Sequence, residues 1–211
     1  MPSEKLARIF DADRAMRSAE RELLDLKPAQ VAEFLSEAVV AAKNNEDALE
    51  SALRLERLAD LCAQVPGPLM ADALLSILDE EEPSVRVAAG EALLEVAYDY
   101  YAEVARAIDR ALDRDDKGPA MSELPFLLAE VGEPGASKQL KRFLKSSEPE
   151  IVAATIEASA ASMDVEMLEP LRLLMDDGRE VVVEDFDEET HATLGQLAAE
   201  AVAALEVLEE E

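Results

Sequence analysis

The chain repeats itself, and this self-similarity restricts the fold more than any other feature of the sequence. When the sequence is shifted against itself, residues 67–92 fall on residues 133–158. The matching pairs are Pro68 with Pro134, Leu74 with Leu140, Leu78 with Leu144, Pro83 with Pro149 and Ala88 with Ala154. The offset equals two units of about 33 residues, a length typical of paired-helix repeats.

Each unit has the pattern of two helices. In the first, Met70, Leu74 and Leu78 recur at helical spacing, so one face is expected to be buried. The second begins at Pro83, and proline is tolerated there because the first turn has no intrahelical use for its missing N–H. Gly90 lies in the middle of this second helix, where it costs about 1 kcal/mol relative to alanine. We expect a close backbone contact to explain it.

Residues 82–93 read Glu-Pro-Ser-Val-Arg-Val-Ala-Ala-Gly-Glu-Ala-Leu, which resembles the second-helix signature of a HEAT repeat. The equivalent segment after Glu148 keeps the proline and the aliphatic residues but has Val152 where the family usually places arginine. The resemblance extends over about residues 68–176, and its unit length is similar to that of the shorter bacterial HEAT-like repeats. It implies an all-α, right-handed α-α superhelix, a HEAT/armadillo-like solenoid.

The expected organisation is a single HEAT-like repeat domain over residues 1–211, with about five helical hairpins and an N-terminal helix. An amphipathic helix at 3–26 is expected to cap the stack, since a terminal unit lacks one neighbour. The expected helical pairs are 28–65, 68–99, 101–131, 134–163 and 165–208, with the last helix at 188–208.

The charge is strongly negative but unevenly spread. The net charge is −28, yet the basic and acidic residues within 1–27 balance, so the whole excess falls in residues 28–211. A negative field repels nucleic acid and anionic membranes and attracts basic partners. The sequence therefore predicts a protein partner with a basic patch, no nucleic acid and no membrane. Solubility, or life in high salt, is the other interpretation of the same acids.

The candidate partner-binding residues are acids and aromatics expected on exposed surfaces. The second helices of such an array line its inner surface, and tyrosine suits binding hot spots. The segment 177–187 is long for a helix–helix connection and holds a β-prone island. The candidates are Glu91, Glu95, Tyr98, Tyr100, Tyr101, Glu123, Glu157, Val182, Asp185 and Phe186. The alternatives are solvated helix faces, tyrosines packed over helix ends, and a 177–187 loop folded back on its own repeats.

The sequence predicts no enzyme and no cofactor. His191 is the sole histidine and Cys62 the sole cysteine, so the usual nucleophile–histidine systems lack candidates. The fragment from Asp113 imitates the start of a calcium loop but fails at Lys117, so no metal site is expected. A lone cysteine, no signal sequence and no long apolar run indicate a cytoplasmic protein.

These observations predict a non-catalytic protein–protein interaction scaffold or adaptor. The resemblance to HEAT-like proteins also implies an alternative, because some of them are accessory or lyase-type subunits that attach bilin chromophores. The acidity allows a further alternative, an acidic DNA mimic that occupies a DNA-binding protein. No small-molecule substrate is evident from the residues.

Overall fold

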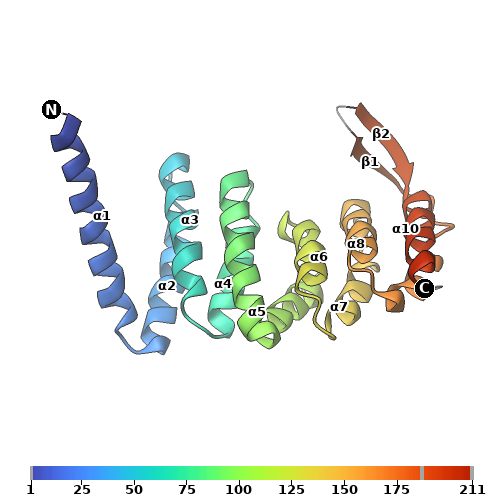
Figure 1. Cartoon of the computed structure of the whole chain (residues 1–211), viewed down its shortest axis with the longest axis horizontal. Coiled ribbons are helices and arrows are strands. Elements are labelled where there is room, and N and C mark those ends of the chain that lie inside the picture. The colour runs from blue at the N-terminus through green and yellow to red at the C-terminus, as the bar shows by residue number, and fades with distance from the viewer. Residues whose placement is uncertain (1, 186–187, 210–211) are drawn as a thin grey trace.

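The computed structural model describes residues 2–185 and 188–209, and in it the helices stand in chain order along the longest axis of the molecule (Figure 1). The helices are α1 (Pro2–Leu24), α2 (Pro28–Lys43), α3 (Ala48–Ala63), α4 (Pro68–Leu78), α5 (Pro83–Asp113), α6 (Ala120–Val131), α7 (Ala136–Phe143), α8 (Pro149–Ala161), the 3-10 helix η1 (Val165–Met167), α9 (Leu168–Arg172) and α10 (Leu194–Glu209). The strands are β1 (Glu180–Asp185) and β2 (Glu188–Thr193). The prediction of a mostly helical chain is confirmed.

The helices pack against their neighbours in two rows. In one row α3, α5, α6, α8 and α10 contact one another in that order, and in the other α2 contacts α4. Helix α5 belongs to both rows because it bends at Tyr100, whose backbone (φ −137°, ψ 46°) is not helical. The expected turn between residues 99 and 101 is thus present as a sharp bend.

Local signals in the sequence set where the helices begin. Pro68, Pro83 and Pro149 each occupy the first position of a helix, where a missing N–H costs nothing. Helix α3 starts differently, because the side chain of Asp47 accepts hydrogen bonds from two backbone N–H groups of the first turn. Such caps satisfy donors that have no partner within the helix.

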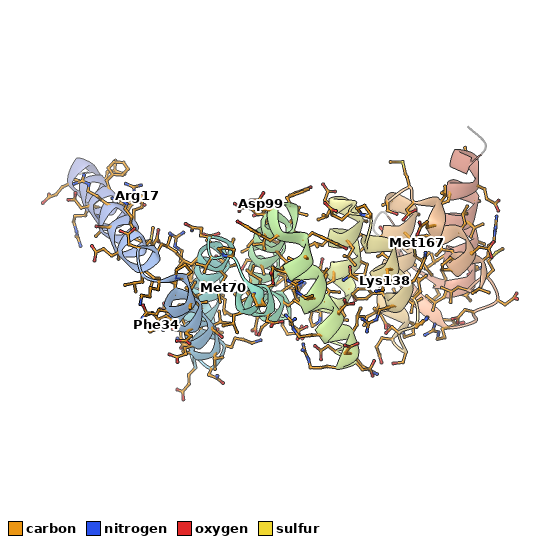
Figure 2. All side chains as sticks on the ribbon, turned by 90° about the horizontal axis from the view of Figure 1, so that it is seen from below. Arg17, Phe34, Met70, Asp99, Lys138 and Met167 are labelled. Carbon is orange, nitrogen blue, oxygen red and sulfur yellow. The ribbon has the colours of Figure 1, made fainter. Side chains whose placement is uncertain are left out.

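Small aliphatic side chains form the core between the rows. Ala59, Ala71, Ala89 and Ala107 are fully buried, and short side chains let neighbouring helices approach closely. Polar contacts join successive helical pairs at sequence separations of 33 to 38 residues. Figure 2 displays the side chains along the molecule. The hydrogen bonds that link successive pairs run from Lys43 Nζ to Ser76 Oγ at 3.0 Å, from Arg142 Nη1 to Asp109 Oδ1 at 2.6 Å and from Arg110 Nη2 to Asp72 Oδ1 at 2.7 Å.

The C-terminal part departs from the all-α expectation. Strands β1 and β2 pair as a two-stranded antiparallel hairpin, with Val182 opposite His191, and α10 begins at Leu194 rather than at 188. Branched residues explain the difference, because valines on β1 and threonines on β2 favour extended backbone. The hairpin packs on α8 and α10, so this segment folds back on the chain's own helices.

Helix α1, expected at residues 3–26, contacts the rest of the molecule mainly through its C-terminal part. Its C-terminal residues Leu23 and Leu24 pack against the core. Farther toward the N-terminus, α1 diverges from its neighbours (Figure 1). The large apolar side chains there are exposed: Leu6, Ile9, Phe10 and Met16.

Among the described residues, no helix is long and apolar enough to cross a bilayer.

Candidate binding groove

Two adjoining hollows form a groove over the row that contains α5, α6, α8 and α10. The first, of about 440 Å³, lies between α5 and α6. The second, of about 710 Å³, lies between α6, α8, α10 and β1. Glu123 and Phe126 of α6 line both hollows, so the two are parts of one continuous surface.

The floor of this groove is apolar, and it is built by residues that the helices turn away from the core. Val87 is 60% exposed and Phe126 is 38% exposed, although both lie in helices whose other faces are buried. Val182 on β1 is 56% exposed and closes the groove at the hairpin. Further apolar residues of the floor are partly or fully buried and join it to the core: Gly90, Ala153, Ala160, Leu197 and Ala201.

Carboxylates surround this floor. Glu123, Glu130, Glu157 and Glu200 line the groove and are all exposed. Arg86 is the basic residue among the lining side chains. Its Nη1 donates to the carbonyl oxygens of residues 80 and 81, and its Nε lies 3.7 Å from Glu123. The arginine is thus held between the turn that joins α4 to α5 and the Glu123 carboxylate, while three of the four glutamates have no basic neighbour among the lining residues.

The structure brings three of the candidate residues together in the groove: Glu123, Glu157 and Val182. Glu91 and Glu95 are exposed on α5 but are not among the lining residues. Asp185 ends β1 opposite Glu188 in the register. Phe186 lies outside the described residues.

The three tyrosines have different surroundings. Tyr98 is exposed, and its hydroxyl donates to Glu130 Oε1 on α6 at 3.4 Å, close to the groove. Tyr100 is exposed at the bend of α5. Tyr101 is partly buried and donates to Gln139 Oε1 at 2.8 Å, and burial, with Glu133 and Asp109 adding to it, raises its pKa to about 12. Tyr101 therefore joins α5 to α7.

Gly90 differs from the expectation, because no close backbone contact explains it. A Cβ built on Gly90 would meet only Leu78 Cδ1, at the ordinary distance of 3.9 Å. Gly90 instead forms part of the groove floor. This floor was not predicted from the sequence, although a signal was present: Val87, Gly90 and Leu94 lie at helical spacing on a second face of α5.

The two residues considered for catalysis lie far apart in the row. Cys62 is fully buried in α3, and burial raises the pKa of its thiol to about 12. His191 is exposed on β2, near the other end of the molecule. Within the described residues, no cluster of three or more His, Cys, Asp or Glu side chains could hold a metal ion. A groove with an apolar floor and an acidic rim is suited to binding a complementary surface.

No protein-family model matches the chain, and no curated protein matches it in sequence.

Proposed function

We propose that this chain is a HEAT-like helical solenoid that acts as a non-catalytic binding module for a basic protein segment. The repeat in the sequence supports the solenoid, since contacts between successive pairs recur at separations such as 33 for Lys43 with Ser76 and 34 for Gln139 with Ala105. Stacked helical pairs of this kind present long binding surfaces.

The observation that carries the binding role is the groove itself. Exposed Val87, Phe126 and Val182 supply apolar surface, and removing that surface from water on binding is favourable. The glutamates around them supply negative charge, and Arg86 beside Glu123 is the one basic side chain that lines the described groove. The complementary ligand is an amphipathic helix or strand, with an apolar face for the floor and lysine or arginine on its flanks.

A synthetic peptide of leucine and lysine with helical periodicity is the direct probe. We expect it to bind the full chain in fluorescence anisotropy at low salt, and we expect binding to weaken as salt rises. The matched peptide with glutamate in place of lysine should not bind. Equal binding of the two peptides would rule out charge recognition by the groove.

The double variant Glu123→Gln/Glu157→Gln should weaken peptide binding by about tenfold. Each exposed ion pair contributes up to about 1 kcal/mol, and about 1.4 kcal/mol corresponds to a factor of ten. The control is Glu33→Gln/Glu37→Gln, which makes the same change in net charge at exposed positions of α2. If both double variants lost the same affinity, the peptide would be responding to overall charge and the groove would not be its site.

Another prediction concerns Gly90. We expect Gly90→Ala to stabilise the protein by about 1 kcal/mol, because alanine favours the helix and its Cβ has room beside Leu78 Cδ1 at 3.9 Å. Urea denaturation measures the change. The larger Gly90→Leu should fill the floor and weaken peptide binding. A destabilised Gly90→Ala would mean that glycine is needed there for packing, and the groove would lose this support.

A further inference from the structure

Helix α1 and helix α3 meet at one point and separate beyond it. The guanidinium of Arg57 on α3 pairs with Glu20 on α1. This contact lies in the C-terminal part of α1, which also packs against the core. Toward the N-terminus α1 leans away from the row, as both views show, with Arg17 marking it in Figure 2 (Figures 1 and 2).

The faces that diverge from this ion pair carry exposed apolar side chains beside the ion pairs Arg17–Asp13 and Arg54–Glu50. Residues four apart lie on the same side of a helix. Leu53 and Leu49 therefore continue the face of α3 that carries Arg57, and they are 53% and 70% exposed. On α1, Met16 and Ile9 continue the face that carries Glu20, about one and three turns away, and Ile9 is 60% exposed.

The same end of the molecule lacks the charge of the rest. Residues 2–24 contain five basic and five acidic side chains: Lys5, Arg8, Arg14, Arg17, Arg21, Glu4, Asp11, Asp13, Glu20 and Glu22. Their sum is zero, whereas the whole chain carries −28. Two copies repel each other wherever their other surfaces approach. They can approach without that repulsion at α1.

We propose that α1 pairs two copies of this chain, with the exposed apolar residues of each α1 packing against those of α1 and α3 of the other copy. The chain itself supplies the helix that these residues need as a partner, and that helix has exposed apolar side chains and no net charge. Exchange of identical helices about a two-fold axis buries the same side chains on both copies and closes the assembly as a dimer. This interface lies at the opposite end from the groove, so the inference goes beyond the proposed function.

Sedimentation equilibrium of the full chain tests the pairing. We expect a reversible dimer. Ile9→Glu and Leu53→Glu should each raise the dissociation constant of the dimer by about thirtyfold, because each removes an apolar side chain that dimer formation would bury at the interface. Both side chains are exposed in the single chain, so folding should be retained, as circular dichroism can verify. The control Ser18→Glu lies about half a helical turn from Ile9 and should leave the dimer unchanged. A chain that stays monomeric at every concentration would overturn the proposal.

Disulfide trapping tests which helix packs against the exposed residues of α3. Copies with Ile9→Cys are mixed with copies with Leu53→Cys, while the native Cys62 is buried and does not compete. A covalent dimer joining the two kinds of copy supports the exchange. A double variant that forms its disulfide only within one chain would instead show α1 closing on its own α3, and would overturn the exchange.

The effect of salt distinguishes dimer formation through α1 from peptide binding in the groove. Added salt screens the repulsion between two negative chains, so it should strengthen the dimer, while it weakens binding of the basic peptide. Either result can therefore fail without the other.

Discussion

Replacing Phe143 by alanine should destabilise the protein by about 3–5 kcal/mol, the cost usually found when a buried phenylalanine is truncated. Phe143 ends α7, is fully buried and is among the largest buried side chains of the chain. Its loss removes apolar contacts and leaves a cavity that fixed helices on several sides cannot refill. Urea denaturation followed by circular dichroism measures the difference.

The matched control is Phe34→Ala on α2, where the ring is half exposed (Figure 2 labels Phe34). The same atoms are removed, yet the expected change is well below that at Phe143, because exposed substitutions usually stay within about 0.5 kcal/mol. Helix α7 packs chiefly against α5, α6, α8 and η1. Hydrogen exchange in Phe143→Ala should therefore accelerate first in those helices and last in α2. Uniform acceleration along the chain would contradict this local effect.

The sequence predicted the helices well because their starting signals are local. Proline at 68, 83 and 149 marks the first turn whatever surrounds it. The apolar spacing in 70–78 similarly needs no knowledge of other segments. Where structure depends on partners distant in sequence, the prediction was weaker. The stretch 188–193 was expected to be helical, but it pairs with the valines of β1.

Helix α1 shows the same limit. Its amphipathic pattern predicts an apolar face that should pack against another segment. The pattern does not predict the angle at which the helix meets the rest of the chain after Leu24.

The groove could be predicted only in part. The acidic residues Glu123 and Glu157 were found because acidic residues on a helical face are easily recognised in a sequence. The floor residues Val87 and Phe126 were missed because, from the sequence alone, an exposed valine or phenylalanine cannot be distinguished from one in the core.

Replacing Gly195 by alanine should destabilise the protein by about 1–3 kcal/mol, the range for forcing an extra carbon into a packed site. Gly195 is the second residue of α10, and its N–H donates to the carbonyl oxygen of Asp177 at 2.9 Å. A Cβ there would lie 2.4 Å from the carbonyl oxygen of Met175 and 3.0 Å from its carbonyl carbon. Both atoms belong to backbone, so neither can move aside by rotating a side chain.

The nearby Gly178→Ala provides the control, because a Cβ on Gly178 meets nothing within 4 Å. Thermal unfolding of the two variants should therefore differ by several degrees, since about 1 kcal/mol shifts the midpoint by roughly 2–4 °C in chains of this size. The contact at Gly195 also holds the start of α10 against the segment that leads into β1, which carries Val182 to the groove. Gly195→Ala should then weaken binding of the leucine–lysine peptide, while Gly178→Ala leaves it intact. The opposite outcome is a Gly195→Ala variant that is as stable as Gly178→Ala and binds the peptide normally. That result would mean that α10 lies farther from Met175, and that the side of the groove formed by β1 does not depend on this close approach.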